Sequence, residues 1–587
     1  MNNESVSSNS SEDEHPRMGL CSGSSSLASP TTDVLRNADL LGLIFSHLYI
    51  HSLEYLSSSS LHTIRQLLAG RQSLLRAGLT CKAFFGPAMS RLWYEMDSLL
   101  PLLLVIPLIT QEGGEYTSTS LVKEGDLHRF KFYASQIRSL YLSSFLDTVS
   151  THIYMAIAAA LQDKTLFPAL THVQILSLDE ISNENFLFLH LIAPSPLSRL
   201  EICDVMESNG IRVTSFMDDM CRLHRPHSEH LHPLYALKLE GSFLPSIGDL
   251  LQNFTRLTNL SFELTASTLR ETLEISSSLS SLFDFKLEVP EESESWTLRN
   301  PVSREFKLYT FPALRNLEVG GPARYLCDVL HSIYGVYISR ITITISSPDR
   351  EDKQKMSKCI QRCIIMTPTL LHLHINFPEG RITMEDDLFA PFQSYRLLRS
   401  LHICSLALTH PHLVDLFDKK FGEWPVLETA TLELNYLHPN CEDFDLPQIS
   451  AIHLPAFSCP KLRRLESYLE LPVPFFRENS QDVEKGMSWQ DILESSERTN
   501  HTLTELRITF FEPDSKVPFP SLDTFMEAKE ALLVARVIDH LFPNLKRLDL
   551  FGDRPRSTWK PWYRGVEKMV QHFREVRSGR PANIHST

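Results

Sequence analysis

Histidine and cysteine are the residue types in this chain of 587 residues whose spacing could support metal chemistry. Neutral imidazoles bind zinc when a firm backbone and second-shell partners orient the rings. The densest group of histidines instead lies in a proline-rich, polar stretch, which predicts a solvated loop. Its members are His224, His227, His230 and His232. Cys359 and Cys363 are four residues apart on a predicted helix, without a second Cys or His pair, and are predicted to be core thiols. We therefore expect no metal site and no cofactor.

Motifs for catalysis are absent from the sequence. It contains no G-x-G-x-x-G, no phosphate-binding loop, no H-E-x-x-H and no G-x-S-x-G. The sequence therefore predicts a protein that is not an enzyme. A hydrolase whose nucleophile and base meet only in space remains a third alternative. The formal net charge of −15 argues against a nucleic-acid partner, which would need a basic face.

A recurring apolar pattern organises most of the chain. It consists of an apolar residue, two gaps, a second apolar residue, one gap and a third, as in Leu545-x-x-Leu548-x-Leu550. The copies begin at Ile137, Leu170, Leu197, Leu234, Leu257, Leu282, Leu314, Ile338, Leu370, Leu398, Leu427, Leu462, Leu503 and Leu545. Two copies are degenerate, because Ala430 and Ser467 replace the expected apolar residues.

The steps between copies run from 23 residues (Leu234 to Leu257) to 42 residues (Leu503 to Leu545). A short strand followed by a helical return is typical of leucine-rich repeats. One unit cannot bury its apolar edge alone, so the units must stack. The predicted fold class is α/β, with an irregular horseshoe-shaped solenoid of about fourteen leucine-rich repeats over residues 137–552. A capping helix and tail are expected at 553–587.

Strand alternation predicts which side chains leave the core. In the copy at Leu370, Leu373 and Ile375 point inward, and His372 and His374 point to the concave face. The central outward positions of the repeats are Tyr141, Gln174, Glu201, Lys238, Ser261, Lys286, Glu318, Thr342, His374, His402, Thr431, Glu466, Arg507 and Asp549. This face has mixed charge, with an acidic band at Glu240, Glu263 and Glu288.

Extended concave faces of solenoids commonly bind other proteins. The predicted target-binding residues are Glu201, Lys238, Lys286, Glu318, Arg340, His372, His374, His402, Arg464, Arg507 and Arg547. The alternative for any one of them is a solvated strand residue without a binding role.

The first hundred residues have a different composition. Residues 1–32 are rich in serine and acidic in part, which predicts a disordered tail. Residues 33–98 have helical apolar spacing, and 99–136 are expected to connect them to the repeats. Asp33 or Asp39 is the expected N-cap, Gly70 should end a helix, and Pro87 should permit a short last helix from Ala88 to Met96.

Three groups of residues in this region resemble an F-box, in particular the F-box-like modules of fungal proteins. They are Leu40-Leu41-x-x-Ile44-Phe45-Ser46-His47-Leu48, Leu75-x-Ala77-x-x-x-Cys81-Lys82-Ala83-Phe84-Phe85, and Leu92-Trp93. The resemblance implies a helical module that docks a Skp-type linker protein of a cullin–RING ubiquitin ligase. The implied linker contacts are Leu40, Leu41, Ile44, Phe45, Leu48, Leu92 and Trp93.

The chain departs from the F-box pattern in two ways. It lacks the usual Leu-Pro before the first helix, and residues 49–70 form an insertion after it. The resemblance implies a substrate-recognition adaptor that binds a target protein on its repeats. The alternative is a leucine-rich-repeat scaffold, unrelated to ubiquitin, whose N-terminal helices only cap the solenoid.

Several features predict a soluble protein of the cytoplasm or nucleus, without a membrane partner. The ten cysteines lack paired spacing, which suggests reduced thiols. The N-terminus has no charged and then apolar signal sequence. The most apolar run, 99–109, contains two prolines and is shorter than the roughly twenty residues that span a bilayer.

Overall fold

The computed structural model divides the chain into two compact units, Met1–Glu95 and Met96–Thr587. The residues that it describes are 37–48, 61–142, 149–161, 165–176, 187–224, 233–241, 243, 246–263, 269–289, 307–346, 358–363, 367, 369–376, 395–404, 424–433, 452, 455, 459–470, 493, 501–511, 525–552 and 560–578. The predicted tail at 1–32 lies outside these residues, as do His227, His230 and His232.

The first unit contains three described helices, α2 (Ala38–Ser46), α3 (Leu61–Thr80) and α4 (Lys82–Leu92). Helix α4 packs against both α2 and α3. Their apolar faces meet in one small core, in which Phe45 and Phe84 make an edge-to-face contact with ring centroids 5.6 Å apart. The fully buried members of this core are Leu41, Phe45, Leu74, Ala88 and Met89.

Helix boundaries in this unit differ from those predicted. Asn37 caps α2, because its Oδ1 accepts hydrogen bonds from the backbone N–H groups of Asp39 and Leu40. Gly70 lies inside α3 instead of ending a helix, and Pro87 lies inside α4 instead of preceding a separate helix. A Cβ at Gly70 would lie 2.8 Å from the carbonyl oxygen of Leu48, so glycine permits a close approach of the backbones there.

Among the described residues, fifteen strands form one sheet in chain order, and all of them after β1 lie in the second unit. The sheet begins with β1 (Glu95–Met96), and every pairing from β4 to β19 is parallel. The later strands are β4 (Ser139–Leu142), β5 (His172–Ile175), β6 (Arg199–Val205), β7 (Ala236–Gly241), β8 (Asn259–Glu263), β9 (Asp284–Glu288), β11 (Asn316–Pro322), β13 (Arg340–Ser346), β14 (His372–Asn376), β15 (Ser400–Cys404), β16 (Thr429–Glu433), β17 (Arg464–Glu470), β18 (Glu505–Phe511) and β19 (Arg547–Gly552).

Each of these fourteen strands begins two residues after one of the fourteen predicted pattern starts. The first apolar residue of a copy lies in a turn just before the strand, as where Leu257 N–H donates to the carbonyl of Phe254 at 3.0 Å. The second and third apolar residues lie in the strand and point into the core. Leu373 and Ile375 are each 1% exposed, as strand alternation predicts.

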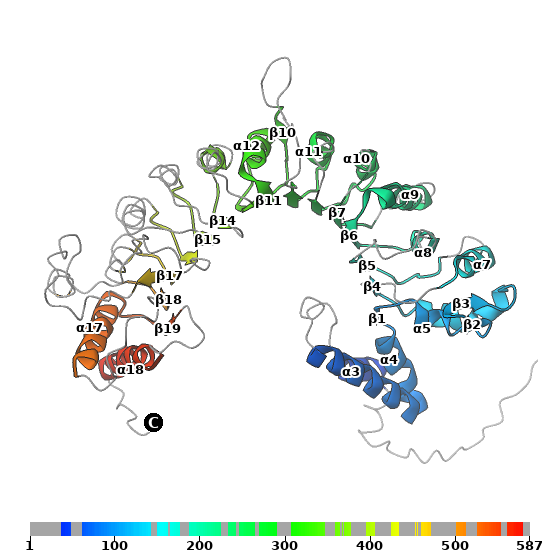
Figure 1. Cartoon of the computed structure of the whole chain (residues 1–587), viewed down its shortest axis with the longest axis horizontal. Coiled ribbons are helices and arrows are strands. Elements are labelled where there is room, and N and C mark those ends of the chain that lie inside the picture. Colours follow the sequence, from blue (N-terminus) through cyan, green and yellow to red (C-terminus); the bar gives the residue numbers. More distant parts are fainter. Residues whose placement is uncertain are drawn as a thin grey trace, which may run out of the picture. The chain divides into compact units, whose positions relative to one another are not determined.

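Helices connect many of the successive strands and lie together on one face of the sheet (Figure 1). They are α7 (Thr151–Leu161), α8 (Leu187–Ile192), α9 (Glu207–His224), α10 (Ile247–Leu251), α11 (Leu269–Ser278), α12 (Ala323–Ser332) and α17 (Phe525–Leu541). We call the opposite face of the sheet the open face. The fold is therefore α/β, with one long parallel sheet.

Smaller elements complete the second unit. Its first part contains α5 (Leu100–Leu103), the antiparallel strands β2 (Ile109–Glu112) and β3 (Glu115–Ser118), η1 (Glu124–Leu127) and α6 (His128–Ala134). A turn at Gly113 and Gly114 joins β2 to β3, and both glycines have positive φ. Strands β10 (Tyr309–Thr310) and β12 (Ile333–Tyr334) pair separately. The predicted closing helix is α18 (Lys560–Arg577), which packs on α17 and β19.

The described residues include eight of the ten cysteines of the chain. No disulfide joins any of the eight cysteines in this part of the chain. Cys359 and Cys363 are fully buried, as predicted for core thiols. Burial raises the pKa of Cys363 to about 12. Over the same ranges, no helix has the length and apolar character that a bilayer span requires.

Candidate functional site

The open face of the sheet carries the predicted row of outward residues in register. Glu201 pairs with Lys238, Lys238 with Ser261, and Ser261 with Lys286. The row continues through Glu318, Thr342, His374 and His402 to Thr431, Glu466, Arg507 and Asp549. Strand pairing therefore places side chains from all these repeats next to one another.

A groove of about 480 Å³ crosses the open face from β6 to β13. Five predicted target-binding residues line it, namely Glu201, Lys238, Lys286, Glu318 and Arg340. Lys286 Nζ lies 2.7 Å from a carboxylate oxygen of Glu318, and Lys238 Nζ lies 2.6 Å from Glu240. These carboxylates outweigh the effect of burial and raise the pKa of both lysines, which are therefore cationic at neutral pH.

Sequence reasoning missed a polar ladder on the floor of this groove. The side-chain amides of Asn259 and Asn316 both donate hydrogen bonds to the carboxylate of Asp284. The three residues are register partners on β8, β9 and β11. They occupy the first outward position of three consecutive copies of the apolar pattern. This shared position in the sequence could have predicted that their side chains meet.

Arg340 is the cation of the groove that has no ion-pair partner within the described ranges. Its register partners on the two neighbouring strands are Asn316 on β11 and His372 on β14. Arg340 and Arg399 add to the effect of burial in lowering the pKa of His372. An unpaired guanidinium can bind a carboxylate or phosphate through two parallel hydrogen bonds, so this end of the groove favours an acidic group of a ligand.

Glu201 is buried in the open face, although the sequence predicts it as an exposed contact. It is 6% exposed, and Arg199 Nε donates to its Oε1 at 2.5 Å. The Nε2 atom of His172 lies 3.6 Å from the same oxygen. Burial acts to raise the pKa of the Glu201 carboxyl, but His172 and Arg199 lower it by more, so the pKa lies below its ordinary value.

This shift predicts how stability depends on pH. Because the pKa is lowered in the folded state, ionised Glu201 stabilises the fold above the ordinary glutamate pKa of about 4.3. That contribution is lost as the pH falls through the folded-state pKa. Glu201→Gln does not titrate, so we expect its free energy of unfolding to fall less than that of the wild type on acidification.

Denaturant unfolding at a series of pH values measures this difference. Glu318→Gln is the control, because Glu318 lies in the same row but its side chain is 43% exposed. Parallel pH curves for the wild type and Glu201→Gln would contradict the prediction.

The predicted arginines near the C-terminal end of the sheet are held by neighbouring carboxylates. Arg464 and Arg507 both contact Glu466, at 3.2 and 3.0 Å. Glu466 is 7% exposed. Arg547 Nε lies 2.7 Å from Asp549. These pairs hold the guanidinium groups in place along β17, β18 and β19.

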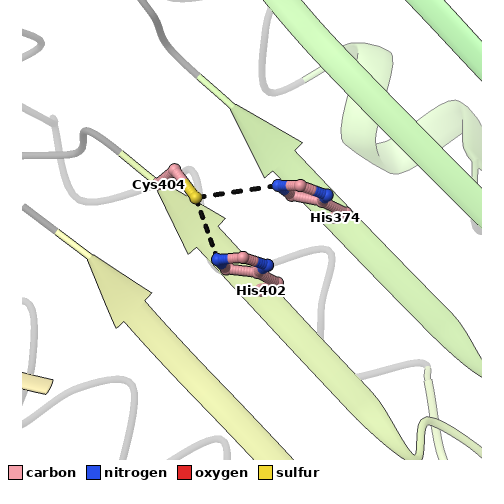
Figure 2. Close-up of side chains that lie close together, drawn as sticks. All are labelled: His374, His402 and Cys404. Atoms are coloured by element: carbon pink, nitrogen blue, oxygen red, sulfur yellow. Dashed lines mark hydrogen bonds between the residues drawn. The ribbon is translucent and has the colours of Figure 1, made fainter. Parts of the chain in front are cut away.

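His374 and His402 come together on neighbouring strands, and Cys404 lies beside them (Figure 2). The imidazole rings are stacked, with centroids 4.2 Å apart and an interplanar angle of 7°. His372 is one pleat away, in register with Ser400, and is not part of this group. The structure therefore separates the three predicted histidines into a pair and a single residue.

The predicted linker contacts in the first unit fall into three groups. Leu41 and Phe45 are 2% and 4% exposed, so they belong to the core of the unit and not to a docking face. Leu92 and Trp93 are half-buried against that core. The contacts that remain at the surface are Leu40, Ile44 and Leu48, which are 39%, 49% and 40% exposed.

Helix α2 thus presents an apolar ridge to solvent. Leu40 and Ile44 are four residues apart and so share one side of the helix. Leu48 lies in the turn just beyond the helix end. Leu43, which sequence reasoning missed, adds a neighbouring apolar side chain that is 63% exposed. Leu43 does not share the i, i+4 spacing of the buried Leu41 and Phe45, and this could have predicted its exposure. We call Leu40, Leu43, Ile44 and Leu48 the α2 ridge.

No protein-family model matches the chain, and no curated protein matches it. The α2 ridge can bury apolar area against a protein, and the groove on the open face can bind a charged protein surface.

Proposed function

We propose that this chain is the substrate-recognition adaptor of a cullin–RING ubiquitin ligase. In this proposal α2, α3 and α4 form an F-box-like module that docks a Skp-type linker protein. The fourteen strands belong to leucine-rich repeats, whose open face binds a target protein. The adaptor would act in the cytoplasm or nucleus.

The α2 ridge carries the proposal. Its side chains are exposed although the core of the first unit is already filled by Leu41, Phe45 and their neighbours. Apolar residues that recur along one side of a helix are the anchors of helix-mediated docking. The residues with this exposure include Leu40, Ile44 and Leu48, which the resemblance to F-box modules assigns to the linker.

The repeats support the other half of the proposal. One strand per unit, a helical return in many units and steps of irregular length are typical of leucine-rich repeats. The groove on the open face carries fixed cations and carboxylates, and Arg340, which has no ion-pair partner among the described residues. Mixed charges of this kind provide specificity for a protein partner. The adaptor has no chemical step of its own, because other subunits would transfer ubiquitin once the target is held close to them.

Titration of the full chain with purified Skp-type linker protein tests the proposal. We expect saturable binding with one linker per chain. A variant that lacks residues 1–93 keeps the repeats and should not bind.

Absence of binding by a full chain whose N-terminal helices are shown to be folded would overturn the adaptor proposal. The scaffold function would then be favoured. The missing Leu-Pro and the insertion at 49–70 are the observations that speak for it.

A further inference from the structure

Two histidines and one cysteine converge on the open face, at the boundary of β14 and β15. His374 and His402 are register partners on the two strands, and Cys404 follows His402 by two residues. Residues two apart on a strand share a face of the sheet, so all three side chains emerge on the same side. Figure 2 shows ring nitrogens of both histidines directed at the sulfur of Cys404.

The three side chains are close enough together to bind the same ion. The Sγ atom of Cys404 lies 2.9 Å from Nε2 of His402 and 3.6 Å from Nε2 of His374. The three candidate ligand atoms lie within 4.8 Å of one another. Among the residues described here, this is the one group of three or more His, Cys, Asp or Glu side chains that meets this criterion.

These separations can be compared with those around a tetrahedral zinc ion. Zn–S bonds of about 2.3 Å and Zn–N bonds of about 2.05 Å place the sulfur and each nitrogen about 3.6 Å apart. His374 already has this separation from Cys404. The Nε2 atom of His402 lies 2.9 Å from the sulfur, so it would have to move away by about 0.7 Å, which a change in the side-chain torsions of His402 provides.

The backbone that carries the cluster is held on both sides. Strand β14 pairs with β13, and β15 pairs with β16. On the opposite face Leu373, Ile375 and Leu401 are at most 1% exposed, which fixes the strands against the core. Ligands on packed strands are positioned more firmly than ligands on loops. This firm backbone is the feature that the stretch containing His224, His227, His230 and His232 was predicted to lack.

We propose that His374, His402 and Cys404 bind one zinc ion on the open face. Thiolate and imidazole ligands together favour zinc among the common divalent ions. On binding, the Cys404 thiol releases its proton to solvent and the thiolate forms a bond to zinc, while each neutral imidazole donates the lone pair of its Nε2. Both the ion and the thiol keep their oxidation states.

Three protein ligands leave one tetrahedral position, which a water molecule or a side chain of another protein can fill. The inference goes beyond the adaptor function and does not depend on it. It also differs from the sequence-based expectation of no metal site, because the sequence does not show that Cys404 meets the two rings.

Cobalt is the probe for the first experiment, because a bond between thiolate and Co²⁺ gives a charge-transfer band and tetrahedral Co²⁺ gives strong d–d bands. The full chain is stripped of metal by a chelator and titrated with Co²⁺, and then with Zn²⁺ as competitor. We expect one cobalt ion per chain, displacement by zinc and release of about one proton per ion.

Single variants then assign the ligands. Cys404→Ser should abolish the charge-transfer band, and His374→Ala and His402→Ala should each weaken binding by at least about tenfold. All three side chains lie on the open face, so the variants should fold, which circular dichroism checks. Zinc should raise the melting temperature of the wild type and not that of Cys404→Ser.

Two control variants address adventitious binding. His372→Ala removes an imidazole from the same face of β14 without touching the cluster and should bind like the wild type. A second control replaces His224, His227, His230 and His232 by Asn and should also bind like the wild type. The proposal is overturned if the wild type shows no saturable binding, if Cys404→Ser keeps the charge-transfer band, or if the second control loses the site.

Discussion

Replacing Phe285 by Ala is expected to lower the free energy of unfolding of the second unit by about 3–5 kcal/mol, because a large core side chain is removed and a cavity remains. Phe285 is 1% exposed, and its ring stacks on that of Phe311 with centroids 5.6 Å apart. It lies between Leu260 and Leu317 in the same inward row of the sheet. The cavity would therefore disturb the contacts between three successive strands.

Phe283 provides a matched control for this change. It is the same residue type two positions earlier, and it is 44% exposed. Phe283→Ala should change the free energy of unfolding by less than about 0.5 kcal/mol, as is usual for surface substitutions. Denaturant unfolding of both variants measures the two costs, and equal costs would contradict the assignment of Phe285 to the core.

The location of the effect can be tested as well. Repeat arrays are stabilised mainly by contacts between neighbouring units, and local opening can occur below the global transition. Hydrogen exchange should therefore become faster in β8, β9 and β11 of Phe285→Ala and stay unchanged in β18 and β19. Uniformly faster exchange would instead indicate that the whole sheet unfolds as one cooperative unit.

Strand positions could be predicted from the sequence because one physical constraint acts in every repeat. Each copy must supply a buried residue in the turn and two more in the strand, as Leu314, Leu317 and Val319 do. The degenerate copy with Ala430 still forms a strand, because its neighbours in register, Leu401 and Leu465, continue the inward row. Pairing on both sides supports a strand whose own pattern is weak.

Helix boundaries in the first unit could not be predicted from local signals. Glycine after an amphipathic stretch usually indicates a helix end, but Gly70 is required where the backbone of Leu48 passes close to α3. This contact joins segments that are distant in sequence. Pro87 is the sixth of the eleven residues of α4, beyond the first turn in which proline is ordinarily tolerated, so the rule for proline did not predict a continuous helix there.

In the candidate sites, too, local patterns predicted some features, and contacts between distant segments determined the others. Alternation along a strand identified the outward residues, including His374 and His402, without any knowledge of pairing. It did not show that Cys404 would meet both rings, because that depends on side-chain rotamers across two strands. In the first unit, helical spacing did not separate the buried Leu41 and Phe45 from the exposed Leu40 and Ile44. The reason is that packing against α4 determines which side of α2 faces the core.

Truncation of the α2 ridge is expected to weaken capture of the linker protein without unfolding the first unit. The double variant Leu40→Ala/Ile44→Ala removes two apolar side chains that are 39% and 49% exposed. If each contributes at least about 1 kcal/mol on docking, the affinity should fall at least tenfold. Because neither side chain belongs to the buried core, the helix signal in circular dichroism should be unchanged.

A double variant of the two buried residues of α2 is the matched control. Leu41→Ala/Phe45→Ala removes the same number of side chains from the same helix, but at positions that are 2% and 4% exposed. Leu→Ala and Phe→Ala in cores cost about 2–5 and 3–5 kcal/mol, so this variant should lose linker capture together with the part of the helix signal that comes from the first unit. Titration calorimetry with purified linker protein and circular dichroism together distinguish the two causes of lost binding. Full capture by Leu40→Ala/Ile44→Ala would show that the linker does not dock on the α2 ridge, since the exposed side chains that define it would then make no contribution to binding.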